Sequence, residues 1–342
     1  MTDVEGSAAD HTAKVATARA GNQEALGELF ERHRRELLVH CYRMLGSFTE
    51  AEDLLQETFE RAWRSIDRFE ADQPPRAWLY KIATNACLDV LRRRGRRRLL
   101  PFDVMDPVRP GGSLPQGAGE LWLEPFPDRL LEDPVGDPGE AVVQRETIEL
   151  AFLAAIQHLP GLQRAVFLAR DVMGWSAKAT AALLGSSEAS VKSALQRARA
   201  TMKEHLPRRR DDWGGEAAVG DREREVLRRY IDAHQQNDIA AMAEVLTDDL
   251  RVAYPQIPLW SDSRDAFIQA TREFASPGDY RFVATSANRQ PAVAIYHRPP
   301  GAPAFRLTAL EVLRIEGDRV AEIVDFDVPA LYPAFGLEPT LP

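Results

Sequence analysis

The sequence predicts a multi-domain chain in which two all-α units, joined by a flexible linker, precede an α+β unit. Apolar residues recur at helical spacing over residues 14–98 and again over 140–206. The residues between them, 99–139, are rich in Pro and Gly, as linkers are. After a second linker over 207–220, helices give way to strand-like runs within 221–336.

Composition and charge limit the classes of function. The 342 residues carry a net charge of −9, which argues against a protein that coats nucleic acid with cations. Cys41 and Cys87 form no metal-ligand spacing, so we expect no disulfide framework, no metal and no cofactor. The N-terminus shows no apolar signal segment, and no apolar run approaches the roughly 18 residues of a membrane helix. These features together predict a cytoplasmic protein without a membrane partner.

The first unit begins with two consecutive helices. An apolar stripe over 26–45 has the spacing of one long helix, and Gly46 interrupts it. Thr49 and Glu52 then match a capping box, in which a Thr hydroxyl and a Glu carboxylate bind the first free amides of a helix. We therefore expect the second helix to run from 50 to 64.

A third helix over 75–94 combines two faces. Four apolar residues at helical spacing can face a core: Trp78, Ile82, Leu88 and Leu91. The opposite side carries cations for phosphates, and amide and carboxylate groups for base edges: Lys81, Asn85, Asp89, Arg92 and Arg93. Trp78 and Tyr80 are also of the type that stacks on bases. The alternative is an amphipathic surface helix with a solvated charged face.

The linker and the second unit have their own signals. Eight Pro and six Gly lie within 101–139, but the island Leu121–Asp128 is apolar enough to dock on another surface. Helices are expected over 140–159, 162–172, 176–184 and 187–206. The last two, separated by Gly185, have the pattern of a helix-turn-helix, although an ordinary helical hairpin has the same pattern.

The C-terminal unit is expected to be α+β. Two segments have helical periodicity: 222–246 and 264–274. Extended runs are rich in β-branched and aromatic residues: 251–254, 280–287, 292–297, 305–315 and 320–328. Glu316–Asp318 supplies a hairpin turn between the last two.

The order of these motifs resembles the extracytoplasmic-function (ECF) sigma factors of bacterial RNA polymerase. The segments that carry the resemblance are DLLQETFERAW at 53–63, WLYKIATN at 78–85 and VKSALQRAR at 191–199. The resemblance covers about residues 14–206 and implies sigma region 2 over 14–98 and region 4 over 140–206. Residues 221–336 resemble, by pattern more than by motif, a SnoaL-like member of the NTF2-like cone fold. Together with Trp122–Asp128, this tail resembles the sigma subgroup that carries such an extension.

The resemblance implies a sigma factor that binds core RNA polymerase, through its beta and beta-prime subunits, and directs promoter-specific initiation. In the family, the second helix of region 2 docks on a clamp coiled coil, and the matching residues here are Asp53, Gln56, Glu57, Glu60 and Arg61. The third helix separates the two DNA strands of the −10 element and contacts its bases. The matching residues are Trp78, Lys81, Asn85, Asp89, Arg92 and Arg93. Asn85 occupies the base-contacting position. A solvated acidic face on the second helix, and Asn85 as a hydrogen bonder within its helix, are the alternatives.

For region 4, the resemblance implies that the last helix enters the major groove of the −35 element. The matching residues are Ser187, Glu188, Ser190, Lys192, Ser193, Gln196 and Arg197. Many members of the family carry Arg where this chain has Ala194. We therefore expect one DNA contact fewer, with −35 affinity more dependent on Lys192 and Arg197.

The C-terminal unit leaves more than one function open. NTF2-like cones hold an apolar pocket, and the candidates to line it are Tyr254, Trp260, His297, Asp325 and Asp327. His297 could instead lie on the rim, and the two aspartates could be the solvated face of an edge strand. We expect regulation of the sigma factor, with a small-molecule ligand as a candidate partner, and no enzyme activity.

Two alternative functions compete with this interpretation. One is a one-component helix-turn-helix regulator with a ligand-sensing tail, and the other is an isomerase or cyclase carried by the tail. Residues 49–98 disfavour the first, because a simple regulator has no use for a docking helix followed by a strand-opening helix.

Overall fold

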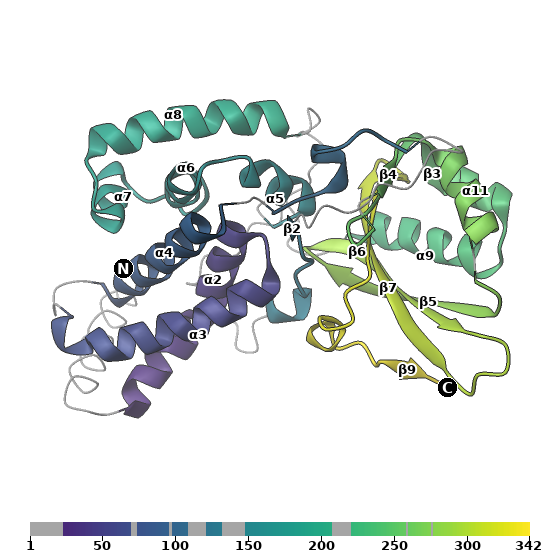
Figure 1. Ribbon diagram of the computed structural model, residues 1–342, viewed down its shortest axis with the longest axis horizontal. Helices are drawn as coiled ribbons and strands as arrows, with labels where there is room; N and C mark the ends of the chain where they lie inside the picture. The colour runs from purple at the N-terminus through teal and green to yellow at the C-terminus, as the bar shows by residue number, and fades with distance from the viewer. Residues whose placement is uncertain are drawn as a thin grey trace. The chain divides into compact units, whose positions relative to one another are not determined.

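The computed structural model describes most of the chain: residues 23–69, 74–95, 98–108, 121–131, 148–206, 220–257, 259–274 and 276–342. It divides into two compact units, one comprising residues up to Arg97 with Ala155–Leu206, the other comprising Arg98–Ala154 with 207–342 (Figure 1). Several predicted segments lie outside the described residues: 14–22, 109–120, 132–147 and 207–219. No helix among the residues described is both long and apolar enough to span a bilayer.

The first part of the helical unit is a three-helix arrangement. Its elements are α2 (Gln23–Leu45), α3 (Phe48–Ser65) and α4 (Pro75–Arg94), with a short 3-10 turn at Ile66–Arg68. Each helix packs on the other two, and the side chains of Leu37, Tyr42 and Leu79 are wholly buried between them. Pro75 starts α4, where its missing N–H costs nothing, and Gly95 ends it in a left-handed conformation at φ 64°.

The start of α3 differs from the expectation. Ser47, not Thr49, is the N-cap: its hydroxyl accepts a hydrogen bond from the Glu50 amide at 3.1 Å. Ser47 has extended backbone (φ −137°, ψ 126°), whereas Thr49 already lies inside the helix. The capping-box assignment at Thr49 and Glu52 was therefore wrong by two residues, because a Ser two positions earlier offers the same hydroxyl chemistry.

The second part of the helical unit contains the expected helix-turn-helix. Its elements are α5 (Leu150–Gln157), α6 (Gly161–Phe167), α7 (Ala177–Leu184) and α8 (Glu188–His205). Ser176 and Ser187 cap α7 and α8 through their hydroxyls, and Gly185 turns the chain between them at φ 58°. The helix expected over 162–172 instead widens after Phe167 into a π-helical turn, Leu168–Val172.

The C-terminal unit is built on one curved sheet with helices on one face (Figure 1). The strand order is β4-β3-β8-β7-β6-β5, with β9 also paired to β7; β3 and β8 are parallel and the other pairs are antiparallel. The strands are β3 (Leu246–Tyr254), β4 (Leu259–Ser261), β5 (Asp279–Ala287), β6 (Gln290–Arg298), β7 (Phe305–Glu316), β8 (Arg319–Phe326) and β9 (Thr340–Leu341). This is the predicted α+β unit.

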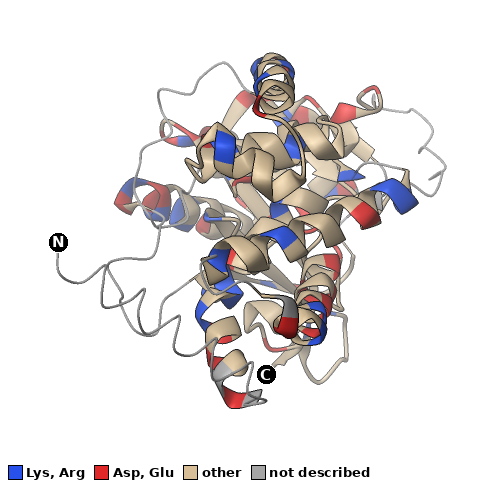
Figure 2. Cartoon of the chain, turned by 90° about the vertical axis from the view of Figure 1, so that its left-hand side faces the viewer, with Lys and Arg blue, Asp and Glu red and all other residues tan. Residues whose placement is uncertain are grey.

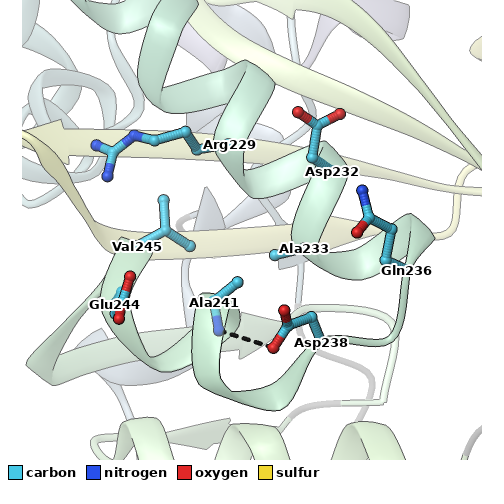
Figure 3. Close-up of a pocket in the computed structure, with 8 residues that line it drawn as sticks. All are labelled: Arg229, Asp232, Ala233, Gln236, Asp238, Ala241, Glu244 and Val245. Atoms are coloured by element: carbon cyan, nitrogen blue, oxygen red, sulfur yellow. Dashed lines mark hydrogen bonds between the residues drawn. The ribbon is translucent and has the colours of Figure 1, made fainter.

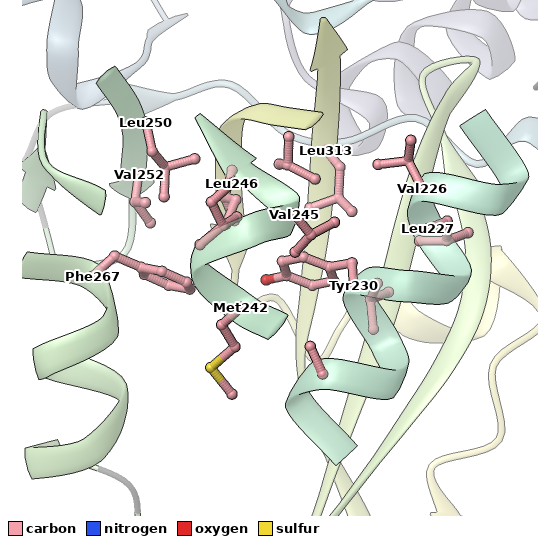
Figure 4. Packing of buried hydrophobic residues seen from close by; sticks show 14 of the residues in the cluster. Val226, Leu227, Tyr230, Met242, Val245, Leu246, Leu250, Val252, Phe267 and Leu313 are labelled. Carbon is pink, nitrogen blue, oxygen red and sulfur yellow. The ribbon is translucent and has the colours of Figure 1, made fainter. Parts of the chain in front are cut away.

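Three helices and the sheet enclose the core of this unit (Figure 4). They are α9 (Asp221–Gln235), α10 (Ile239–Val245) and α11 (Arg264–Phe274). The single helix expected over 222–246 is broken, because Asn237 adopts φ 51° and the Asp238 carboxylate then caps a new helix. The break lets Tyr230 and Met242, which lie on different helices, enter the same apolar cluster.

Parts of the Pro/Gly-rich segment belong to the C-terminal unit. They form β1 (Arg98–Leu99), β2 (Leu121–Trp122) and two short 3-10 turns, Pro101–Asp103 and Asp128–Leu131. The strands β1 and β2 pair with each other in parallel. Phe126 is wholly buried, which confirms the expectation that the apolar island docks on another surface.

We expect Ser47→Ala to lower the stability of the helical unit by about 1 kcal/mol, since the variant loses the only side-chain cap found on α3 within the described residues. Thr49→Ala is the matched control, and it should change stability by less than about 0.5 kcal/mol. Thermal unfolding followed by circular dichroism at the helical band compares the two. An equal loss in both variants would contradict the placement of the cap.

Candidate nucleic-acid interface and C-terminal site

Helix α4 is held at both ends by charged side chains of its neighbours. Near its start, the Glu36 carboxylate accepts hydrogen bonds from Arg76 Nε at 2.7 Å and from the Tyr80 hydroxyl at 3.2 Å. At its end, Arg94 Nη1 donates to Glu50 Oε2 at 2.8 Å. Both ends of α4 are therefore fixed against α2 and α3 by charge-assisted hydrogen bonds.

A buried polar contact holds the middle of α4. His40 Nε2 and Thr84 Oγ1 lie 2.9 Å apart, and both side chains are buried. Burial, followed by repulsion from Arg43, lowers the pKa of His40 to about 3, so the imidazole is neutral. A neutral ring can lie in this core without a counter-ion, and α4 is thereby attached to α2 at a third point.

The outer face of α4 carries the predicted −10 residues. The side chains of Lys81 and Asn85 are exposed, and among the described residues neither makes a hydrogen bond or an ion pair. Asp89 is half-buried and pairs with Arg92 at 2.9 Å and with Arg61 at 3.7 Å. The helices of this unit carry basic and acidic residues interspersed (Figure 2). A hollow of about 430 Å³ is lined by Arg61, Asp89, Arg92 and Arg93.

The aromatic residues of α4 lie on its inner side. Trp78 is 8% exposed and packs edge-to-face on Phe69, with ring centroids 4.9 Å apart. Tyr80 is also buried. The structure therefore places Trp78 in the core, where it supports the helix, and leaves the polar residues of the predicted set on the surface.

The predicted polymerase-binding residues form the outer face of α3. Asp53, Gln56 and Glu60 are exposed, and Glu60 pairs with Arg64 one turn later at 2.8 Å. Arg61 donates to Glu57 at 2.7 Å and also approaches Asp89 of α4. Arg61 therefore lies where the predicted polymerase face and the predicted −10 face meet.

Helix α8 presents the predicted −35 residues to solvent. All of them are exposed: Ser187, Glu188, Ser190, Lys192, Ser193, Gln196 and Arg197. Ser187 is committed to capping the helix, and Arg197 Nη1 donates to Ser193 Oγ at 2.7 Å. Ala194 is 3% exposed and faces the core with Val191. Position 194 therefore faces inward in this chain, away from the exposed face of α8, and the expected dependence of −35 affinity on Lys192 and Arg197 stays a prediction.

In the C-terminal unit, two carboxyl groups face each other across neighbouring strands. Glu311 of β7 and Asp325 of β8 are directly opposite partners in the antiparallel ladder. Each lies two residues along its strand from a member of the core pair Leu313 and Ile323. Side chains two residues apart share a face of a sheet, so both carboxyl groups point to the face covered by the helices. The Tyr230 hydroxyl of α9 donates to Glu311 Oε2 at 2.8 Å.

Burial changes the protonation of this pair. It raises the pKa of Glu311 to about 8, with further repulsion from Asp325. It likewise raises the pKa of Asp325, to about 7, with further repulsion from Asp327. At neutral pH the two carboxyl groups therefore hold a proton between them. The described residues contain no group of three or more side chains that could hold a metal ion.

The structure brings together some of the predicted pocket residues and separates others. Tyr254 lies on the same sheet face as Asp325, one strand away. Trp260 lies on the opposite face: it pairs with Ala253, and its indole N–H donates to the Met105 carbonyl at 2.7 Å. Tyr254 and Asp325 are thus neighbours of the carboxyl pair, whereas Trp260 contacts the 98–108 segment.

The remaining predicted pocket residues lie at edges. His297 stacks on Tyr280, with ring centroids 4.6 Å apart, and its Nε2 lies 3.0 Å from the Pro277 carbonyl. Asp327 is exposed just beyond β8. The sequence did not lead us to predict Glu311. An acidic residue at a strand position whose neighbours two residues away are apolar is nevertheless a signal that could have indicated it.

A small hollow lies between α9 and α10 (Figure 3). Its volume is about 170 Å³, and it is lined by Arg229, Asp232, Ala233, Gln236, Asp238, Ala241, Glu244 and Val245. Several of its polar groups serve the fold: Asp238 caps α10, Arg229 donates to the Asp318 carbonyl, and Asp232 pairs with Arg228. We assign it no ligand.

The turn between β5 and β6 binds two other segments of the same unit. Asn288 adopts φ 57°, and its side-chain Oδ1 accepts from the Phe126 amide at 2.8 Å. Its Nδ2 donates to the Ile148 carbonyl, also at 2.8 Å, and its own amide donates to the Phe126 carbonyl at 2.9 Å. One buried amide side chain therefore joins the linker to the residues that precede α5.

The next two residues extend this contact, and residues 288–290 are called here the linker clasp. The Arg289 amide donates to Asp128 Oδ1 at 2.7 Å. Gln290 accepts from the Leu150 amide at 2.8 Å and donates to the Leu313 carbonyl of β7 at 3.2 Å. The linker clasp thus connects the linker and the start of α5 to the central strands of the sheet.

Comparisons with known proteins agree with this arrangement. Family models match three parts of the chain: sigma-70 region 2 over 29–97, sigma-70 region 4 over 149–202 and a SnoaL-like domain over 227–323. The ECF RNA polymerase sigma factor SigG of Mycobacterium tuberculosis is 40% identical over 91% of this chain and 83% of its own length. SigM, from the same organism, is 33% identical over 55% of this chain and 80% of its own.

One solved structure has the same fold along most of the chain. The crystal structure of the Mycobacterium tuberculosis extracytoplasmic function sigma factor SigJ superposes with a TM-score of 0.60 at 19% identity. The superposition covers 91% of this chain and 99% of SigJ.

We expect Glu311→Gln to make the stability of the C-terminal unit less dependent on pH. A carboxyl group whose pKa is higher in the folded chain than in the unfolded chain stabilises the fold. This stabilisation is complete below about pH 4.5, the ordinary pKa, and is lost as the pH rises through about 8. From about pH 5 to pH 9, the free energy of unfolding of the wild type should fall by about 2–4 kcal/mol more than that of the variant. Glutamine keeps the acceptor for Tyr230.

Urea unfolding of the full chain, followed by hydrogen exchange of the β7 and β8 amides, measures this difference. The exposed Glu273→Gln is the matched control and should keep the wild-type pH dependence. A wild-type unit whose stability stayed level from acid to alkaline pH would contradict the buried, protonated pair.

Proposed function

Because the chain belongs to the extracytoplasmic-function family of RNA polymerase sigma factors, which direct promoter-specific transcription initiation, we propose a division of this work among its helices. The outer face of α3 binds core polymerase, α4 contacts the −10 element, and α8 contacts the −35 element. The C-terminal unit regulates the other two parts. The protein acts where polymerase and DNA are, in the cytoplasm.

The proposal for α4 depends on one observation: Asn85 is an uncommitted, exposed amide on a helix that is fixed at three points. An amide side chain can both donate to and accept from the Watson–Crick edge of a flipped base. A contact that selects one base needs a rigid backbone, because small displacements remove its hydrogen bonds. Lys81, Arg92 and Arg93, exposed on the same helix, supply cations for the neighbouring phosphates.

The proposal for α3 is based on its exposed acidic and amide side chains. Asp53 and Gln56 are exposed and, among the described residues, make no side-chain hydrogen bond or ion pair. Such groups suit a polar interface with a basic partner surface, which charge attraction brings together quickly. We assign this partner to the beta-prime subunit of polymerase, with the beta subunit contacting other parts of the chain.

The proposal for α8 is based on its position after the turn at Gly185. Second helices of helix-turn-helix units place their N-terminal residues against base edges. Lys192 and Gln196 are exposed and, within the described residues, have no side-chain partner. Gln is suited to an adenine edge, and Lys to guanine or to phosphate.

The proposal for the C-terminal unit is based on the linker clasp. Asn288 holds both Phe126 of the linker and Ile148 before α5, so the path of the chain from region 2 to region 4 is restrained. We assign the unit no catalytic role, because the Tyr230 hydroxyl and Glu311 are buried and bonded to each other. A small ligand beside Glu311 would be a second means of control, since Gln290 bonds the same strand at Leu313.

Asn85→Ala should weaken promoter opening by about tenfold or more while leaving core binding intact, because it removes the base-contacting amide from the surface. Asp53→Ala should give the opposite profile, with weaker core binding. Run-off transcription on a promoter selected from a genomic pool, together with a core-binding titration, measures both. Promoter opening that Asn85→Ala leaves unchanged would contradict the assigned role, whereas loss of both activities would indicate misfolding.

Asn288→Ala should raise transcription at limiting protein by about fivefold, because three hydrogen bonds that restrain the linker and α5 are weakened. Asn237→Ala is the matched control, since Asn237 also adopts a positive φ in a turn of the same unit, and among the described residues its amide donates to the His234 carbonyl and not to the linker. The control separates release of the linker from the strain of Ala at positive φ. Equal transcription by both variants would contradict regulation through the linker clasp.

A further inference from the structure

A hollow on the surface of the helical unit is lined by three arginines and one acidic residue. It lies between α3, which supplies Arg61, and α4, which supplies Asp89, Arg92 and Arg93. Its volume of about 430 Å³ falls within the range of small-ligand sites, about 300–1,000 Å³. The hollow is therefore large enough to take a phosphate group with part of its sugar.

The acidic residue, Asp89, contacts each of the three arginines. Its Oδ1 lies 2.9 Å from Arg92 Nη2, and its Oδ2 lies 3.7 Å from Arg61 Nη1. Its backbone carbonyl accepts a hydrogen bond from Arg93 Nε at 3.4 Å. One residue at the centre therefore orients three guanidinium groups that come from two helices.

The arginines around the hollow carry more charge than their partners balance. Glu57 Oε1 holds Arg61 from its other side, accepting from Nε at 3.2 Å and from Nη2 at 2.7 Å. The three guanidinium cations exceed the two carboxylates that hold them, Asp89 and Glu57, by one positive charge. Arg93 keeps both its Nη groups free among the described residues. A guanidinium fork with free donors suits a phosphate, to which it makes two parallel hydrogen bonds.

The hollow lies beside the residue proposed to contact a base. Asn85 precedes Asp89 by four residues on α4, and residues four apart on a helix are neighbours on its surface. Asn85 is exposed, as are Arg92 and Arg93. The backbone of a DNA strand whose base reaches Asn85 therefore passes next to the three guanidinium groups.

We propose that the hollow binds one phosphodiester of the opened −10 strand between its three arginines, and that Asp89 positions these arginines and contacts no base; this inference rests on the proposed function. Arg61 then belongs to the DNA site, although it lies on the helix assigned to polymerase. The two roles of an acid beside DNA differ in sign. Removal of an acid that only repels phosphate strengthens DNA binding, whereas removal of an acid that positions three arginines weakens it.

Asp89→Asn tests this sign, because the amide keeps the shape of the side chain and removes its charge. The full-length chain is loaded with excess core polymerase, and its affinity is measured on a promoter selected from a genomic pool. The variant should bind about fivefold more weakly than the wild type, equally for every base substitution in the −10 element. The slope of log affinity against log salt should also become shallower by about 0.7, the value for one single-stranded phosphate.

Glu31→Gln is the matched control for the loss of one negative charge from the same unit. Glu31 is an exposed residue of α2, and its side chain has no hydrogen bond or ion pair among the described residues. This variant should not lower the affinity for the promoter.

Chemical removal of single phosphates locates the contact. In a set of promoters, one phosphate at a time along the opened strand is replaced by an uncharged methylphosphonate. At one position the wild type should bind about fivefold more weakly, whereas Arg61→Gln, which is already weakened, should lose almost nothing further. If circular dichroism shows that Asp89→Asn disturbs the helices, this comparison decides.

Three results would overturn the phosphate site. One is a promoter affinity that Asp89→Asn leaves unchanged or raises. Another is a loss confined to promoters with one particular base, which would make Asp89 a base-contacting residue. The third is a methylphosphonate series in which Arg61→Gln loses as much as the wild type at every position. Failure of the wild-type chain to bind core polymerase or any promoter would instead refute the proposed function, so the two failures are distinguishable.

Discussion

The burial of the Arg164 guanidinium is the interaction on which the helical unit depends. A cation removed from water needs acceptors for its donors, and Gln157, Leu159 and Met44 supply them for the four N–H groups on Nη1 and Nη2. These groups end α5, lead into α6 and end α2. One side chain therefore fixes how three helix ends meet, and the packing of α6 and α7 on α4 follows from it.

In the same unit, the residues that hold α4 in place and the residues proposed to contact DNA lie on opposite sides of the helix. On its inner side, Trp78 and the neutral His40 fill the core, and Glu36 and Glu50 fix the two ends of the helix. On its outer side, Asn85 stays free of partners within the described residues. A rigid helix with an uncommitted polar surface is the arrangement that selective recognition of a base requires.

The C-terminal unit shows how much of the fold the sequence could predict. Alternation predicted its strands, and the apolar island predicted a docked linker, because both signals are local. The partner of Phe126 was not predictable, since Asn288 lies 162 residues away and is one of many turn asparagines. Of the carboxyl pair, Asp325 was predicted and Glu311 was not. The strand register that places the two carboxyls opposite each other is a tertiary property.

Residue spacing by itself determined the order of helices and strands, the helix-turn-helix, and the polar residues exposed on α3, α4 and α8. These depend on helical period and turn chemistry, which act over a few residues. Only the tertiary structure decided that Tyr80 and Ala194 face inward, that Trp78 takes its expected place in the core and not a stacking place on the surface, and that Asn288 holds the linker. It also decided that the Arg164 guanidinium of α6 donates to the Met44 carbonyl at the end of α2. Each of these depends on which distant groups exclude water from a side chain, and a local pattern carries no information about that.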